Sequence, residues 1–239
     1  MSQPPTPTLE YQTPPPPRWR LRDDMAYILP MGVFLAFTWA GGQWPNLYPA
    51  SYVAKTIVVA ILLALLWRHY TRIAWSHAGL GVIVGVIGIV QWVGMEKLLL
   101  AGGEWTSWTR MSAEPFEPTE FFTSTTVMWS FILFRWAGAT LLVPVMEELF
   151  WRDFVWRTII APNDFKLAQV GEFDWKAFLI VPAIFAMVHV QWLTAIVWGL
   201  LIAWLLVRTK SLGACIIAHA VTNFLLGAYV LITREWYFW

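Results

Sequence analysis

Two adjacent glutamates, Glu147 and Glu148, lie near the end of a long apolar run, and Arg152 follows the second by four residues. An ionisable residue near the centre of a membrane helix costs roughly 2.5–3.5 kcal/mol on insertion scales, so such residues mark candidate sites. Helical residues four apart share a face, whereas adjacent residues point about 100° apart. We therefore expect Glu148 to pair with Arg152 and Glu147 to be free to face other groups.

Two later apolar runs contribute polar residues at the same spacing. His189 follows Phe185 by four residues, and Asn223 follows His219 by four residues. A single intramembrane histidine is explained by an interhelical hydrogen bond, worth about 0.6 kcal/mol, and the carboxylate–arginine pair alone by a helix clamp. Together, two carboxylates, two imidazoles and an amide are the groups that water activation requires: a base, a second proton carrier and donors for an oxyanion.

The composition indicates that membrane helices position these groups. Of 239 residues, 58% are hydrophobic and only 13% are charged, with a mean hydropathy of +0.56. A soluble domain carries about 25% charged residues. The net charge of +1 gives no reason to expect a nucleic-acid partner, and the single Cys215 allows no intrachain disulfide.

The apolar residues gather in seven segments that predict transmembrane helices. These are Met25–Gly41, Ser51–Trp67, Ala78–Met95, Thr126–Phe150, Ala177–Gln191, Leu193–Val207 and Leu212–Thr233. Lipid admits only helices or closed barrels, and the period-two alternation of barrel strands is absent from the sequence. Several segments are shorter than the ~20 residues that cross a bilayer core, so those in the range 177–207 could be tilted, broken or re-entrant. We predict an all-α polytopic transmembrane helical bundle of about seven spans, with six to eight possible.

The positions of the prolines predict the domain organisation, and those of Lys and Arg predict the orientation in the membrane. Residues 1–24 are proline-rich, which is typical of a disordered tail, and residues 25–239 form the integral membrane domain. Lys and Arg gather in alternate loops, so the N-terminus should be cytoplasmic and, with seven spans, the C-terminus outside. We expect the bacterial inner (plasma) membrane. Lys55 and Arg135 lie early in their segments, where long stems can snorkel to the interface.

The polar residues form three ordered motifs. They are Glu-Glu-x-x-x-Arg at Glu147, Glu148 and Arg152, Phe-x-x-x-His at Phe185 and His189, and His-x-x-x-Asn at His219 and Asn223. In this order they resemble the CPBP family of intramembrane proteases, which includes type II CAAX prenyl proteases and bacteriocin-processing or immunity-associated membrane proteins. The resemblance covers about residues 126–233. Many members continue the first motif with Gly, whereas this chain has Asp153.

The resemblance implies an intramembrane endopeptidase that hydrolyses a peptide bond of a membrane-associated peptide or protein. Glu147 would be the general base that takes a proton from water, assisted by His189. Glu148, held by Arg152, would orient the site. Helix spacing leaves Glu147 free, and we expect its partners to be His189 and His219 on two other helices.

The third motif would act on the substrate carbonyl. By the resemblance, His219 and Asn223 polarise the scissile carbonyl and stabilise its oxyanion. Zn²⁺ is left open as a cofactor, with Glu147, His189 and His219 as candidate ligands. The chain has no His-Glu-x-x-His helix, and a metal-free glutamate mechanism fits the same residues.

A hypothesis from another class remains beside the protease. The chain could be a non-catalytic polytopic membrane protein, such as an immunity or scaffold factor or a transporter, that uses the polar cluster for helix packing or ion binding. A water-filled pocket reaching both Glu147 and His219 would favour catalysis. A dry, fully paired cluster would favour a structural role.

Overall fold

A computed structural model describes residues 21–112 and 115–239, and every regular element within these ranges is helical. The α-helices are α1 (Leu21–Gln43), α2 (Tyr48–Leu65), α3 (Ala78–Ala101), α4 (Pro118–Phe121), α5 (Thr125–Ala137), α6 (Val143–Glu148), α7 (Trp156–Ile160), α8 (Trp175–Ala186), α9 (Trp192–Thr209) and α10 (Leu212–Thr233). The predicted all-α class is confirmed. The first helix begins inside the predicted tail 1–24, of which residues 1–20 lie outside the described ranges.

Among the residues that the structure describes, six helical stretches are long and apolar enough to cross a membrane. They are Asp23–Gln43, Pro45–Leu65, Ala78–Ala101, Thr125–Ile160, Trp192–Thr209 and Leu212–Thr233. The other predicted segment corresponds to α8, whose 12 residues extend only about 18 Å, less than the ~30 Å of a hydrocarbon core. The range 177–207 is therefore broken, between α8 and α9, as its short apolar runs allowed.

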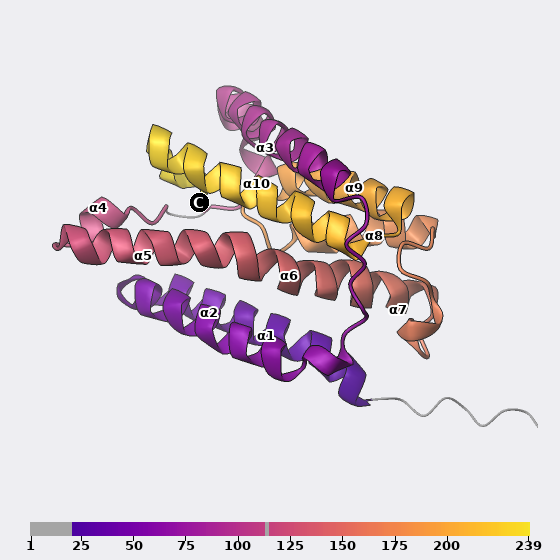
Figure 1. The fold of residues 1–239 in the computed structure, drawn as a ribbon. Helices are drawn as coiled ribbons and strands as arrows, with labels where there is room; N and C mark the ends of the chain where they lie inside the picture. Colours follow the sequence, from indigo (N-terminus) through magenta and orange to yellow (C-terminus); the bar gives the residue numbers. More distant parts are fainter. Residues whose placement is uncertain (1–20, 113–114) are drawn as a thin grey trace, which may run out of the picture.

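One long rod made of α5, α6 and α7 runs through the middle of the bundle (Figure 1). Helices α1 and α2 lie along one side of this rod, and α3 and α10 lie along the other. Helix α10 packs on α3, and α8 packs on α9. The rod therefore brings its glutamates between the two sides of the bundle.

The rod contains two π-helical segments, Gly138–Leu142 and Leu149–Val155. Helix α6, which ends with both glutamates, lies between them. A π-helical turn holds an extra residue, changes which side chains share a face, and occurs often at functional sites. The positions of the glutamates therefore depend on local geometry that regular helix spacing does not describe.

Small residues let α10 approach α3 closely. A Cβ atom at Gly81 would lie 2.7 Å from the Ala214 carbonyl oxygen, and one at Gly85 would lie 2.7 Å from the Ala218 carbonyl oxygen. The Thr222 hydroxyl donates to the Gly85 carbonyl oxygen at 3.0 Å. The Gly-x-x-x-Gly spacing on α3 thus serves helix packing, as is usual in membranes. It fixes the position of the motif on α10.

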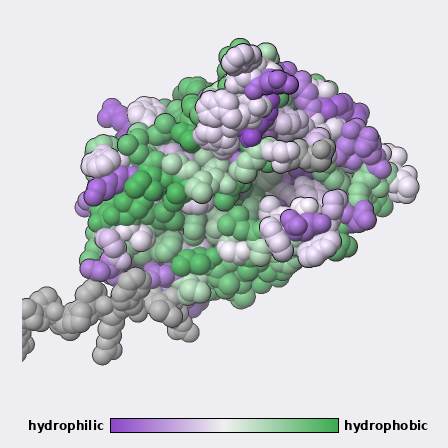
Figure 2. Space-filling view, turned by 180° about the vertical axis from the view of Figure 1, so that it is seen from behind, coloured by the Kyte–Doolittle hydropathy of each residue, from purple (hydrophilic) through white to green (hydrophobic). Residues whose placement is uncertain are grey.

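The outer surface is largely apolar, and hydrophilic residues gather toward the ends of the bundle (Figure 2). Large side chains such as Leu65, Leu98 and Ile232 are exposed. Apolar exposure on this scale would be unfavourable in water and is expected of a surface that faces lipid. The chain is an integral membrane protein.

The two basic residues expected to snorkel instead point inward, and each side chain is only 6% exposed. Lys55 Nζ donates to the Thr38 hydroxyl at 3.0 Å and lies 4.5 Å from the centre of the Tyr52 ring. The Arg135 guanidinium lies 5.5 Å from the centre of the Tyr48 ring. The prediction was wrong because aromatic faces and a hydroxyl inside the bundle receive both cations.

Candidate active site

The structure separates the two adjacent glutamates, and Glu148 forms the expected pair with Arg152. Arg152 Nε lies 3.3 Å from Glu148 Oε2, and Nη1 donates to Glu148 Oε1 at 3.4 Å. Both side chains are 0% exposed. A buried carboxylate is stable only when it is paired and hydrogen-bonded, so the two residues depend on one another.

The third partner of this pair is a histidine from α10. His219 Nδ1 donates to Glu148 Oε1 at 2.8 Å. The sequence predicts His219 as a partner of Glu147, and the two residues do line one cavity, but the hydrogen bond of the imidazole goes to the buried Glu148 carboxylate. Since Nδ1 is engaged, the other ring nitrogen of His219, Nε2, is the one left for a substrate.

Aromatic rings enclose the buried ions. The Arg152 guanidinium carbon lies 4.8 Å from the centre of the Phe185 ring and 5.5 Å from that of Trp198. Those two rings stack with centroids 5.4 Å apart, and the Trp198 ring lies 4.6 Å from the His219 ring. These cation–π and stacking contacts hold the arginine in a dry setting and fix the imidazole plane.

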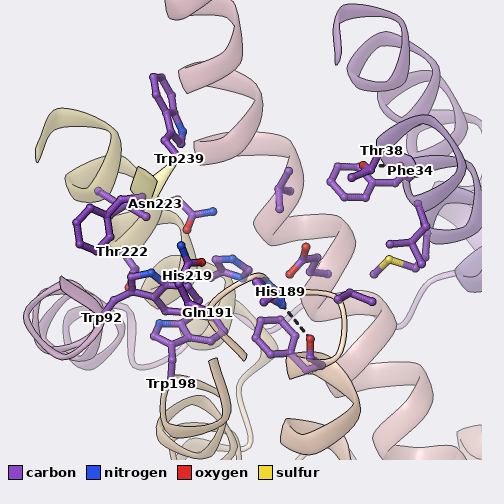
Figure 3. A pocket seen from close by; sticks show the side chains of 18 residues that line it. Phe34, Thr38, Trp92, His189, Gln191, Trp198, His219, Thr222, Asn223 and Trp239 are labelled. Carbon is purple, nitrogen blue, oxygen red and sulfur yellow. Dashed lines mark hydrogen bonds between the residues drawn. The ribbon is translucent and has the colours of Figure 1, made fainter. Parts of the chain in front are cut away.

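His189 lies in the break between α8 and α9. Its Nδ1 donates to the Phe185 carbonyl oxygen at 2.9 Å, the bond drawn as a dashed line in Figure 3, and its ring lies 4.2 Å from the Phe185 ring. In the neutral ring this bond leaves Nε2 as an acceptor. Because α8 ends at Ala186, the break brings His189 to the same cavity as the α10 motif.

Asn223 is held by the irregular part of the rod. In the π-helical segment, the Val143 N–H donates to the Gly138 carbonyl oxygen, five residues back. The next bond of that ladder would join residue 144 to Ala139, but Pro144 has no N–H to donate. Asn223 Nδ2 donates to the Ala139 carbonyl oxygen instead, at 2.8 Å. Its second amide hydrogen and its oxygen are left for other partners.

A cavity of about 310 Å³ joins four of the six predicted residues. Glu147, His189, His219 and Asn223 line it, and Phe34 and Thr38 of α1 close the opposite side (Figure 3). Glu147 is 6% exposed, and its Oε2 has no hydrogen-bond partner among the described residues. The cavity is large and polar enough to hold water. The other two predicted residues, the buried ion pair, lie behind it.

The candidate zinc ligands share a cavity but do not form a three-residue cluster. Within the described ranges, no group of three or more His, Cys, Asp and Glu side chains is placed to hold a metal ion. In both His189 and His219 the Nδ1 atom is engaged, by a main-chain carbonyl and by Glu148, and Nε2 is left free. Such bonds also orient the imidazoles of metal sites, so zinc binding by these residues stays a prediction.

Asp153, where many CPBP proteins have Gly, is completely buried and paired. The Tyr27 hydroxyl of α1 donates to Asp153 Oδ2 at 2.7 Å, and Arg157 forms a short ion pair with Oδ1. Arg157 also donates to the Thr71 hydroxyl at 2.8 Å. The aspartate thus ties the rod to α1 and to the loop after α2, and leaves Glu148 and its arginine undisturbed.

Several residues around the cavity have no signal in the sequence. Trp198 contacts both Arg152 and His219, the two partners of Glu148, yet it is one of 18 tryptophans and belongs to no motif. The segment after α10 folds back, so that Phe238 and Trp239 line the cavity. Gln191 Nε2 donates to the Tyr237 carbonyl oxygen at 3.2 Å and holds this segment. Only the four-residue spacing of Asp153 and Arg157 could have been noticed from the sequence.

Comparison with known families agrees with the site. The family model described as Type II CAAX prenyl endopeptidase Rce1-like matches residues 129–225. This segment of the chain, about two fifths of its length, is similar to the Rce1-like family. The matched range begins within α5, ends within α10 and includes the three motifs, and with them Glu147, His189, His219 and Asn223 of the cavity. No curated protein and no solved structure gives a match.

Proposed function

We propose that this chain is an intramembrane endopeptidase that hydrolyses a peptide bond of a membrane-associated substrate with water activated by Glu147. The observation that supports this most is the shared cavity of about 310 Å³, lined by Glu147, His189, His219 and Asn223. Each of these residues has a free polar atom that could meet water or a carbonyl group. The match of the Rce1-like family model to residues 129–225 supports the same class of reaction.

In the proposed first step, a water molecule hydrogen-bonds to Glu147 Oε2, the oxygen without a protein partner. The carboxylate takes one proton while the water oxygen attacks the scissile carbonyl carbon, and the carbonyl electron pair moves to its oxygen. His189 Nε2 faces the same cavity and would orient this water by accepting its second hydrogen.

The oxyanion that forms would be held from α10. His219, as an imidazolium beside the Glu148 carboxylate, would donate from Nε2, and Asn223 would donate its second amide hydrogen. Fixed donors aimed at developing charge are usually the largest single contribution to such catalysis. Because Glu148 and Asn223 are both tied to the rod, the two donors are oriented before substrate binds.

In the second step the intermediate collapses, and the bond between the carbonyl carbon and the amide nitrogen breaks. Protonated Glu147 gives its proton to the leaving nitrogen. The water is thereby divided between the new carboxyl group and the new amine, and Glu147 returns to its charged form. No other reactant is required.

The geometry favours this reaction over a purely structural cluster. A structural cluster would be dry and completely paired, as Glu148 and Arg152 nearly are. Glu147 differs, because it lines the cavity, and its Oε2 has neither a hydrogen bond nor an ion pair among the described residues, whereas Glu148 Oε2 still meets Arg152. This asymmetry is what a base and its supporting pair require.

The test is a comparison of new protein termini in membranes that contain the wild-type chain, Glu147→Gln or Glu104→Gln. The last variant makes the same chemical change at an exposed loop residue. Mass spectrometry should find a membrane-protein cleavage that is present with the wild type and Glu104→Gln and absent with Glu147→Gln. The same cleavage in all three membranes would overturn the proposal, as would its absence from all three.

A further inference from the structure

A second cavity, of about 320 Å³, lies beside the first. Its lining consists of Thr38, Tyr48, Pro115, Phe116, Arg135, Val190, Gln191, Tyr237, Phe238 and Trp239. Among these described residues, Arg135 is the only one that carries a full charge at neutral pH. The cavity is otherwise aromatic and apolar, so a cation in it is an exception that needs a cause.

Arg135 is more than nine-tenths buried and lacks a counter-ion. Only 6% of the residue is exposed, and its buried Nη1 atom has no hydrogen-bond partner. No carboxylate of the described residues lies within 4.0 Å of the guanidinium; instead its carbon lies 4.6 Å from the centre of the Trp239 ring. Burying an unpaired charge costs several kcal/mol in proteins, and an anionic ligand would offset that cost.

The second cavity shares lining residues with the first. Thr38, Gln191, Phe238 and Trp239 line both. Arg135 and Glu147 are twelve residues apart on the rod, about 18 Å along a helix, so a peptide whose scissile carbonyl lies near Glu147 would reach Arg135 with a group a few residues away. Buried Lys55 donates to the shared Thr38 hydroxyl at 3.0 Å, on the same side.

We propose that Arg135 binds a carboxylate of the peptide substrate and selects peptides that place one a few residues from the scissile bond. This inference rests on the proposed peptidase function. A guanidinium presents paired N–H groups that match a carboxylate in a bidentate geometry. The carboxylate could be a main-chain carboxyl terminus or an Asp or Glu side chain, since the chemistry is the same. The aromatic walls would receive the apolar residues around it.

Binding can be measured in the Glu147→Gln background, in which no cleavage is expected, with the full chain in phosphatidylcholine nanodiscs. The probes are three fluorescein-labelled apolar hexapeptides of one length. The first carries Gln and a free carboxyl terminus, the second carries Glu and an amidated terminus, and the third carries Gln and an amidated terminus. We expect at least one carboxylate peptide to bind about tenfold or more tightly than the third, and the first two show which source is preferred.

Variants of Arg135 identify the cause of the preference. In the same background, Arg135→Gln should abolish the preference, Arg135→Lys should retain part of it, and Lys97→Gln should leave it unchanged because Lys97 lies on the exposed part of α3. The charge-conserving Lys variant keeps the test valid if the Gln variant folds poorly, and thermal unfolding is followed for each.

Three results would overturn the subsite. They are equal affinity for the three peptides, a preference that persists in Arg135→Gln, and loss of the preference when phosphatidylglycerol replaces phosphatidylcholine. The last would assign the guanidinium to an anionic lipid headgroup. Because binding is read in the inactive Glu147→Gln chain, failure here is distinct from failure of the proposed hydrolysis, which the cleavage comparison tests separately.

Discussion

At the scale of single residues, two neighbouring glutamates occupy opposite environments. Glu148 is completely buried and meets Arg152 and His219, whereas Glu147 borders a cavity and has an unpartnered oxygen. The two side chains are chemically identical, so their surroundings alone decide what each can do. One carboxylate is committed to the protein, and the other is available to water.

The buried pair should behave as one unit in stability. Arg152→Met leaves the Glu148 carboxylate buried without its guanidinium, and breaking such a pair costs about 3–5 kcal/mol. The double variant Glu148→Met with Arg152→Met removes both charges and should recover most of the loss. Thermal unfolding in detergent measures both, with Arg208→Met as the control because Arg208 is exposed. Equal unfolding temperatures for the single variant and the wild type would refute the pairing.

At the scale of elements, sequence predicted some helices closely and others poorly, for physical reasons. Helix α10 has the bounds that hydropathy predicted, Leu212–Thr233, because no Asp, Glu, Lys or Arg interrupts it. The rod was predicted to end at Phe150 but continues to Ile160. Hydropathy falls where Asp153 and Arg157 enter the helix, yet these residues neutralise one another inside the bundle.

The site itself was predictable as a set of residues and not as a set of contacts. Four-residue spacing placed the motif residues and foretold the Glu148–Arg152 pair, which is local. The bond from His219 to Glu148 joins residues 71 apart in the chain, and spacing within a helix says nothing about it. The same holds for Trp198 and for the segment after α10, which approach the cavity through tertiary packing.

The missing N–H of Pro144 in the rod leads to a prediction about Asn223. Asn223→Ala leaves the Ala139 carbonyl oxygen without a donor, which should cost about 1–3 kcal/mol of stability. Pro144→Ala restores a main-chain N–H that can bond the same oxygen. In that background Asn223→Ala should cost measurably less, as a double-mutant cycle on thermal unfolding would reveal. Additive losses would contradict this explanation of the bond.

Two glycines of α3 allow a matched comparison, one at the contact with α10 and one away from it. A Cβ atom at Gly85 would lie 2.7 Å from the Ala218 carbonyl oxygen and 2.7 Å from Val221 Cβ, whereas one at Gly94 would meet nothing within 4 Å. Gly85→Ala should push α10 away, lower the unfolding temperature and reduce cleavage. Gly94→Ala should be neutral or slightly stabilising, since alanine favours helix. Equal unfolding temperatures for the two variants would contradict the proposed packing.

At the scale of the whole molecule, orientation is still a prediction from charge. The positive-inside pattern places the loop after α2 in the cytoplasm and the loop after α3 on the opposite side. The single Cys215 is buried, so introduced cysteines can be labelled against a low background. In intact cells, a membrane-impermeant maleimide should label Ser107→Cys and not Ser76→Cys, both of which replace exposed residues. The reverse result would invert the orientation.

The described residues contain no cluster of three or more metal-binding side chains, which leads to a prediction about metal dependence. If Glu147 acts without a metal, incubation with a divalent-metal chelator should leave the cleavage rate of the purified protein unchanged. A chelator-sensitive rate that zinc restores would show that the ligands assemble in another conformation. The matching readout is metal content by mass spectrometry, which should not differ between wild type and His189→Ala.

The central claim is that Glu147 moves the protons of hydrolysis. Its direct measurement is the cleavage rate in proteoliposomes, on a substrate identified from membranes, for the wild type, Glu147→Gln and the exposed-residue control Glu104→Gln. Loss of a general base should lower kcat by about 100-fold or more, and the unfolding temperature should be unchanged because Glu147 Oε2 has no partner to lose. The control should retain full activity. A Glu147→Gln protein that folds and cleaves at the wild-type rate would contradict the account.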